Sequence, residues 1–172
     1  MQDLSLHLLD VAENSISAGA SLVEITLFEE PEKDLLVLTI NDNGRGMDNE
    51  LLSMVDDPFA TTRTTRRVGL GIPMLKQATR EADGSFEIKS VKGEGTRVVA
   101  KFKNSHIDRK PLGDIGSTIV SLVVGNPEVD FIYKSNIEGN EVEFDTREIK
   151  EVLDIDSLSH PSVIKVIREL FT

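Results

Sequence analysis

A long amphipathic pattern followed by two short apolar runs is the feature that most restricts the fold of this chain. Residues 2–18 repeat apolar side chains at helical spacing, and Gly19 follows as a natural helix end. The runs 22–28 and 35–41 have strand character, and the turn between them contains Pro31. This order predicts a helix followed by an antiparallel hairpin, as in a layered α/β domain.

The rest of the chain continues to alternate helical and strand patterns. The predicted segments are helices at 49–55, 70–82, 113–124, 146–153 and 161–170 and strands at 86–91, 96–103, 129–134 and 141–145. The predicted fold class is α/β, a two-layer sandwich with a mostly antiparallel mixed sheet and helices on one face. The polar stretch 104–110 suggests a boundary between a first domain, 1–103, and an α+β extension, 104–172, packed on it.

Composition excludes several classes of protein. The net charge is −11, from 30 acidic and 19 basic residues, and such a surface repels phosphate backbones, so we expect no nucleic-acid partner. The absence of cysteine excludes disulfides and thiolate metal sites. No apolar stretch approaches the roughly 18 residues that a membrane span needs, and the start of the chain is unlike a signal peptide. We expect a soluble cytoplasmic protein with no membrane partner.

The first predicted helix carries a narrow polar stripe opposite its apolar face. Its members are Asp3, His7, Asp10, Asn14 and Ser17. Asp10 and Asn14 are four residues apart and are therefore neighbours on the helix surface. A carboxylate can take a proton or orient water, and an amide oxygen can ligate Mg²⁺. Taken alone, the stripe is more typical of a solvent-exposed helix face, and His7 is expected to be a surface histidine.

A glycine motif follows the second predicted strand directly. Asp42 is separated by single residues from Gly44 and Gly46. Glycine permits positive φ and close approach of backbone to a ligand. The carboxylate at the end of the strand can accept a hydrogen bond from an exocyclic amine such as that of adenine. In isolation these residues are better interpreted as an ordinary turn.

Two further glycine motifs occur later in the chain. Gly69 and Gly71 stand where the helix at 70–82 begins, and the free N–H groups at such an end favour an anion. Gly93, Gly95 and Thr96 occupy the last predicted hairpin of the first domain, where the Thr hydroxyl can bond a ligand. Each motif by itself is weak, and the second is compatible with a plain hairpin turn.

In this order the motifs resemble the ATP site of the GHKL superfamily, which comprises gyrase, heat-shock chaperones, histidine kinases and MutL and has the Bergerat fold. Residues 10–20 resemble its N box, 42–47 its first glycine box, 57–63 its F box, 68–72 its second glycine box and 93–96 its third. The resemblance covers roughly the first 103 residues, and five ordered matches make it specific.

The resemblance implies the ligands ATP and Mg²⁺. Asn14 would ligate Mg²⁺, Asp42 would bond the adenine amine, and Thr96 would lie beside it. Residues 48–68 would form a lid whose arginines are candidates to touch the γ-phosphate. The implied nucleotide-binding residues are Asn14, Asp42, Gly44, Gly46, Met47, Phe59, Thr62, Arg63, Arg66, Arg67, Gly69, Leu70, Gly71 and Thr96.

One departure from the family pattern bears on catalysis. Hydrolysing members carry Glu four positions before the Asn, whereas this chain has the shorter Asp10, its candidate catalytic residue. We therefore expect an Mg-ATP-binding regulatory or partner-binding module with slow or no hydrolysis, a protein partner, and a homodimer as an open question. The alternatives are an ATPase or an anti-sigma-like Ser/Thr kinase that uses Asp10 as general base, or a detached histidine-kinase catalytic domain.

Overall fold

The computed structural model describes residues 3–55 and 71–172, and its helices and strands follow the predicted order. The helices are α1 (Leu4–Ser17), α2 (Asn49–Ser53), α4 (Gly71–Glu81), α5 (Ile115–Gly125), α6 (Thr146–Leu153) and α7 (Pro161–Leu170), with a 3-10 turn at Pro31–Lys33. The strands are β1 (Leu22–Glu30), β2 (Leu35–Asp42), β3 (Ser85–Val91), β4 (Gly95–Lys103), β5 (Asp130–Ile137) and β6 (Asn140–Asp145). Within the two described ranges, no helix combines the length and the hydrophobicity that crossing a membrane requires.

Helix α1 begins where its first free N–H groups find acceptors. The Asp3 carboxylate accepts from the Leu6 N–H at 3.1 Å, as an N-cap does. The N–H groups of Leu4 and Ser5 donate to backbone carbonyls of residues 111–112 at 2.8 and 2.9 Å. The apolar side chains that α1 buries in the core are Leu4, Leu8, Val11 and Ala12. The helix is therefore held at its start by the chain that follows β4, and along its length by the sheet.

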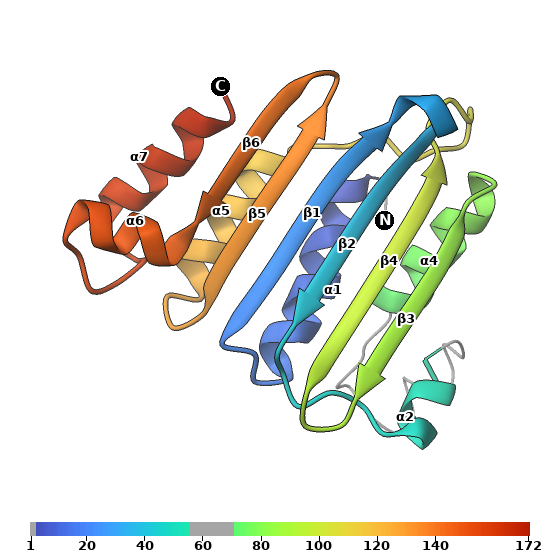
Figure 1. Cartoon of the computed structure of the whole chain (residues 1–172), viewed down its shortest axis with the longest axis horizontal. Helices are drawn as coiled ribbons and strands as arrows, with labels where there is room; N and C mark the ends of the chain where they lie inside the picture. The colour runs from blue at the N-terminus through green and yellow to red at the C-terminus, as the bar shows by residue number, and fades with distance from the viewer. Residues whose placement is uncertain (1–2, 56–70) are drawn as a thin grey trace.

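The six strands form one mixed sheet in the order β3-β4-β2-β1-β5-β6 (Figure 1). Strands β1 and β2 form the predicted antiparallel hairpin, with Thr26 opposite Thr39. The pairing of β1 with β5 is parallel, and the remaining pairs are antiparallel. A parallel neighbour needs a crossover, which the chain makes through α5.

One face of the sheet carries the core. The buried inward-facing residues of the three strands β1, β2 and β4 are Val23, Ile25, Leu27, Leu36, Leu38, Ile40, Val98, Ala100 and Phe102. Figure 1 shows α1, α4 and α5 on the same side of the sheet, with α7 beside α5 near β6. In the described residues no helix covers the opposite face. The predicted fold class, a two-layer α/β sandwich with a mostly antiparallel mixed sheet, is confirmed.

The residues after 103 extend this sheet instead of building a separate one. Strand β5 lies against β1 along Leu22 to Phe28, and β6 forms the outer edge. Aromatic rings join the new elements: Tyr133 packs against Phe144 and Phe171, with ring centroids 5.7 and 5.3 Å apart. The division into domains 1–103 and 104–172 stays a prediction, since sheet pairing alone does not decide it.

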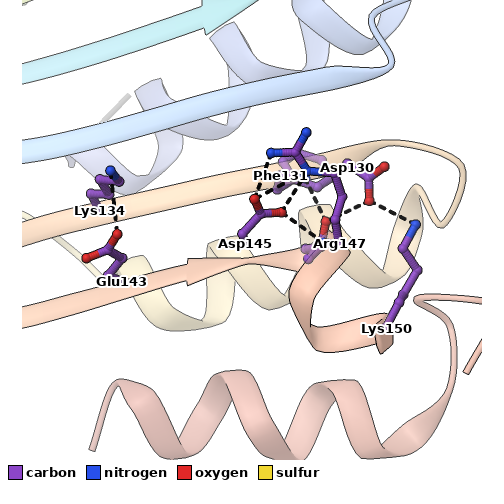
Figure 2. Close-up of polar contacts among 8 residues, drawn as sticks. Asp130, Phe131, Lys134, Glu143, Asp145, Arg147 and Lys150 are labelled. Atoms are coloured by element: carbon purple, nitrogen blue, oxygen red, sulfur yellow. Dashed lines mark hydrogen bonds and ion pairs between the residues drawn. The ribbon is translucent and has the colours of Figure 1, made fainter. Parts of the chain in front are cut away.

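A polar network fixes the junction of β5, β6 and α6 (Figure 2). The fully buried hydroxyl of Thr146 donates to the Asp130 carboxylate and accepts from the Phe131 N–H, both at 2.9 Å. Lys150 Nζ lies 3.0 Å from the same Asp130 carboxylate. Asp145 caps α6, and the Arg147 side chain bonds both its oxygens. Helix α6 is thereby tied to the start of β5.

The prediction of a surface position for His7 is wrong. The side chain is only 2% exposed, and neither ring nitrogen has a hydrogen-bond partner within the protein. It lines a small cavity of about 110 Å³ between α1 and α4, beside the ion pair of Glu81 and Lys110. Helix α4 and the segment after β4 cover this part of the polar stripe, which periodicity alone could not indicate. Burial lowers the pKa of His7 to about 4.

We expect this burial to make folding stability depend on pH. The imidazole of His7 is neutral in the native state, whereas in the unfolded chain it takes a proton below about pH 6.5. The unfolded state therefore binds more protons as the pH falls from about 6.5 to about 4, and stability falls with it. From about pH 7.5 to about pH 5, His7 should remove about 2 kcal/mol from the free energy of unfolding. His7→Gln should abolish this part of the loss.

Urea denaturation at the two pH values measures the effect. His160→Asn is the matched control, because His160 is exposed and caps α7, a role that Asn also performs. A loss of stability of equal size in the wild type and in His7→Gln would contradict the prediction.

Candidate functional site

A cavity of about 210 Å³ lies between α1, the end of β2, the start of β4 and the first turn of α4. Its lining residues are Val11, Asn14, Ser15, Ala18, Ile40, Asp42, Arg45, Gly46, Met47, Asp48, Leu51, Ile72, Lys92, Thr96 and Val98. Apolar walls with a few polar groups are typical of small-molecule sites. Five of the predicted nucleotide-binding residues, separated by up to 82 positions in the sequence, meet here: Asn14, Asp42, Gly46, Met47 and Thr96.

Asp42 contributes to the cavity lining a carboxylate that two hydrogen bonds hold in place. Its Oδ1 accepts from the Gly44 N–H at 2.8 Å, and its Oδ2 accepts from the Ser15 hydroxyl at 2.6 Å. Ser15 is buried on α1, so the bond joins the helix to the end of β2. Each carboxylate oxygen keeps a further lone pair. The group can therefore accept a hydrogen bond from a ligand without reorganising.

Thr96 stands next to Asp42 because of strand register. Thr96 on β4 is the direct partner of Asp42 on β2, and Ser90 on β3 is the partner of Thr96. The Thr96 and Ser90 hydroxyl oxygens are 2.7 Å apart, and the Met47 N–H donates to the Ser90 hydroxyl at 2.8 Å. A row of polar side chains thus crosses three strands on the inner face.

The glycines of the motifs let chain segments pack closely on one another. Gly46 has φ of +68°, and a Cβ there would lie 2.1 Å from the carbonyl oxygen of Val91. Gly95 has φ of +130°, and its Cβ would lie 2.0 Å from the carbonyl oxygen of Asp42. A Cβ on Gly44 would lie 2.9 Å from the backbone of Ala18. The sequence predicts that Gly44 and Gly46 allow the backbone to approach a nucleotide. In the structure, the missing side chains allow other segments of the protein's own backbone to approach these two glycines.

Asp10 and Asn14 share one face of α1 but differ in position. Asn14 lines the cavity, and its amide nitrogen is buried without a hydrogen-bond partner in the protein. Asp10 lies one turn earlier, packed so closely against the start of α4 that a Cβ on Gly71 would lie 3.0 Å from the Asp10 Cβ. Burial raises the pKa of the Asp10 carboxyl. A raised pKa makes the carboxylate a stronger base.

Seven predicted site residues lie outside the described residues. They are Phe59, Thr62, Arg63, Arg66, Arg67, Gly69 and Leu70, and they remain predictions.

Sequence reasoning did not select four polar residues of the cavity lining: Ser15, Arg45, Asp48 and Lys92. Ser15 follows Asn14 directly, but helical periodicity gave no reason to select it. Arg45 stands between two motif glycines, and Lys92 directly precedes Gly93. Both basic side chains line the cavity together with Asp42 and Asp48, so basic and acidic groups are balanced there in a chain of net charge −11. Their positions inside glycine motifs were the available signal.

Comparison with known proteins defines the family. The family model of histidine kinase-, DNA gyrase B- and HSP90-like ATPases matches residues 2–106, more than half of the 172 residues. The chain belongs to this family and is a GHKL ATP-binding domain.

Its relatives in sequence are much longer proteins. Sporulation kinase C of Bacillus subtilis is 28% identical over 88 residues, 51% of this chain and 20% of that protein. A protein of Rickettsia conorii that carries the name of an NtrY-like sensor histidine kinase is 27% identical over 111 residues, 64% of this chain and 18% of that protein. The non-motile and phage-resistance protein of Caulobacter vibrioides is 31% identical over 112 residues, 60% of this chain and 13% of that protein. This chain thus matches only a small part of each relative.

A solved structure supports the same fold over more of the chain. The Aquifex aeolicus MutL ATPase domain, complexed with ADP, aligns with a TM-score of 0.54 and 19% identity, covering 91% of this chain and 70% of that chain. The match extends beyond the family model and so includes part of the region after residue 106.

Substitution of two glycines should separate tight packing from backbone strain alone. Gly46→Ala brings a Cβ against the Val91 carbonyl at positive φ, and we expect it to cost about 3 kcal/mol or more of stability. Gly93→Ala is the matched control, because Gly93 also has positive φ but no atom lies within 4 Å of its Cβ position. It should cost about 1–2 kcal/mol.

The free energy of unfolding, measured with urea, gives both values. Equal costs for the two variants would show that the loop at Gly46 moves freely away from Val91, against this prediction.

Proposed function

We propose that this chain binds Mg-ATP in the cavity at Asp42 and acts as a nucleotide-dependent regulatory or partner-binding module with slow or no hydrolysis of its own. The observation that carries the proposal is the convergence of Asn14, Asp42, Gly46, Met47 and Thr96 on one cavity. These residues come from three separate motifs that match the family pattern in order. Their meeting in space supports the roles that the resemblance assigns to them.

Adenine recognition is proposed for Asp42. Its carboxylate accepts two hydrogen bonds from the protein, from Gly44 and Ser15, and can accept a further bond from an exocyclic amine. Apolar side chains of the wall, including Val11, Ile40 and Ile72, are suited to cover the faces of a purine.

The amide of Asn14 is suited to hold Mg²⁺. An amide oxygen and phosphate oxygens together form a usual Mg²⁺ shell, and the ion would neutralise phosphate charge. The Asn14 amide nitrogen is buried without a hydrogen-bond partner, and the amide oxygen and nitrogen can exchange places by a flip. Asn14 also lies on the side of the cavity formed by α1.

Slow hydrolysis is proposed from the position of Asp10. Asp10 does not line the cavity and is packed against Gly71 at the start of α4. A side chain one methylene longer would extend further from the helix.

The raised pKa of Asp10 favours the rival role as a general base in an ATPase or a Ser/Thr kinase.

A detached histidine-kinase catalytic domain is the second candidate, favoured by the names of the relatives. In such a protein the phosphoacceptor histidine would come from a partner. Within this chain His7 is buried, His106 lies 3.3 Å from Asp83, and His160 caps α7. Each histidine of this chain therefore has a structural role or position that accounts for it without phosphorylation. This candidate, like the first, requires a protein partner, and a homodimer stays open beside it.

Calorimetry with ATP in the presence of Mg²⁺ tests the binding proposal. We expect a dissociation constant in the micromolar to millimolar range, as is usual for ground-state nucleotide sites. Asp42→Asn should weaken ATP binding about tenfold or more, because hydrogen bonds to charged groups are strong. Asp108→Asn, an exposed carboxylate outside the cavity lining, should leave it unchanged.

Two results would oppose the proposal. Folded wild-type protein that gives no heat with either ATP or ADP does not bind nucleotide. If Asp42→Asn lowers the melting temperature but keeps the affinity, Asp42 is a structural turn residue.

An ATPase assay distinguishes the module from the enzyme. We expect wild-type turnover below about one per second, the slow end for enzymes. Asp10→Glu should then raise turnover if the site is otherwise complete, since it restores the reach of hydrolysing relatives. If Asp10 already acts as general base, the wild type should be active, and Asp10→Asn should remove about 10²–10⁴-fold with ATP affinity nearly intact.

A further inference from the structure

Ser90 lies behind the cavity wall and contacts it only through neighbours. It is on the inner face of β3, opposite Thr96 in the strand register, and it does not line the cavity itself. Its hydroxyl oxygen has three polar neighbours: the Met47 N–H at 2.8 Å, the Gly95 carbonyl oxygen at 3.1 Å and the Thr96 hydroxyl at 2.7 Å. A side chain so placed can act on a ligand only by holding other residues.

Counting donors and acceptors decides which way these hydroxyls point. A serine hydroxyl has one proton and two lone pairs. The Met47 N–H occupies one lone pair of Ser90, and the Gly95 carbonyl can only accept. All three contacts are satisfied together if Ser90 donates to Gly95 and accepts from Thr96. If Ser90 donated to Thr96 instead, the contact with Gly95 would lose its hydrogen bond.

The satisfied arrangement leaves Thr96 as an acceptor toward the cavity. Its single proton is used on Ser90, so only oxygen lone pairs remain for a ligand. The neighbouring Asp42 carboxylate is also an acceptor, and its two oxygens are held by Ser15 and Gly44. Two acceptors side by side favour an amine on the ligand and disfavour a carbonyl oxygen, because facing lone pairs cannot form a hydrogen bond.

We infer that Ser90 is a positioning residue for base selection: it orients the Thr96 hydroxyl so that the cavity prefers a 6-amino purine to a 6-oxo purine. The inference rests on the proposed function, since it requires that a purine nucleotide occupies this cavity. It adds to that function a residue outside the motif positions and outside the cavity lining. It also assigns the preference to a cross-strand row of Ser90, Thr96 and Asp42 and not to Asp42 alone.

Comparison of ATP with ITP tests the inference, because ITP replaces the 6-amino group by a carbonyl. Dissociation constants of both nucleotides are measured by calorimetry with Mg²⁺ for the wild type, Ser90→Ala, Ser90→Thr, Thr96→Val and the double variant. Ser90→Ala frees the Thr96 proton to face a 6-oxo group. The preference for ATP over ITP should fall about three- to tenfold, the size of one neutral hydrogen bond.

The other variants separate positioning from simple support of the fold. Ser90→Thr keeps the hydroxyl and should keep the wild-type preference. Thr96→Val should lower the preference as Ser90→Ala does, and adding Ser90→Ala to Thr96→Val should not change it further. Loss of the bond to the Met47 N–H weakens both nucleotides alike, so it does not alter their ratio.

Several outcomes would overturn the inference. If Ser90→Ala weakens the binding of ATP and of ITP equally, Ser90 only holds the backbone of Met47 in place and does not select the base. If Thr96→Val keeps the wild-type preference for ATP over ITP, the Thr96 hydroxyl does not set that preference. This result would overturn the inference even if Ser90→Ala failed to fold. If the wild type binds ATP but shows no preference over ITP, the inference fails and the proposed function stands. If the folded wild type binds neither nucleotide, both fail.

Discussion

The packing of α1 across the inner face of the sheet is the contact on which the rest of the structure depends. Leu4, Leu8, Val11 and Ala12 enter the core, and this sets the rotation of the whole helix. Because the apolar face of α1 is fixed against the sheet, the side chains at the border of that face must point in set directions. Asn14 and Ser15 therefore face the cavity, and the bond from Ser15 to Asp42 joins the helix to the end of β2. The core and the site are stabilised by the same helix.

Backbone contacts hold the walls of the cavity. The Arg45 N–H donates to the Ala18 carbonyl at 2.8 Å, and the Gly93 N–H donates to the Arg45 carbonyl at 2.5 Å. The loop after β2 is thereby joined both to the end of α1 and to the hairpin of β3 and β4. Glycine is needed at Gly46 and Gly95 because any side chain would collide with another backbone. Cavity walls that are held by contacts within the protein reduce the conformational entropy lost when a ligand binds.

The region after residue 103 changes what the sheet exposes. Without β5, strand β1 would be an edge with unpaired N–H and C=O groups, a position prone to association with other chains. Strand β5 covers that edge, and the new edge, β6, carries the acidic side chains Glu141 and Glu143. Charged side chains on an edge strand are a common defence against pairing with another chain. The extension thus protects the sheet at the edge remote from the cavity.

Local sequence was enough to predict the helices and strands, the β1–β2 hairpin and the fold class. It also predicted five residues of the cavity: Asn14, Asp42, Gly46, Met47 and Thr96. These follow from local periodicity, from the conformational freedom of glycine, and from motifs in a recognisable order. The parallel pairing of β1 with β5 and the burial of His7 became visible only in three dimensions. The same is true of the positions of Ser15, Arg45, Lys92 and Ser90 around the cavity. Each of these depends on which segments distant in sequence come to lie together: α4 covers His7, and strand register places Ser90 beside Thr96. Periodicity says which face of an element is apolar, but the partner of each polar side chain at the border of that face is set by packing.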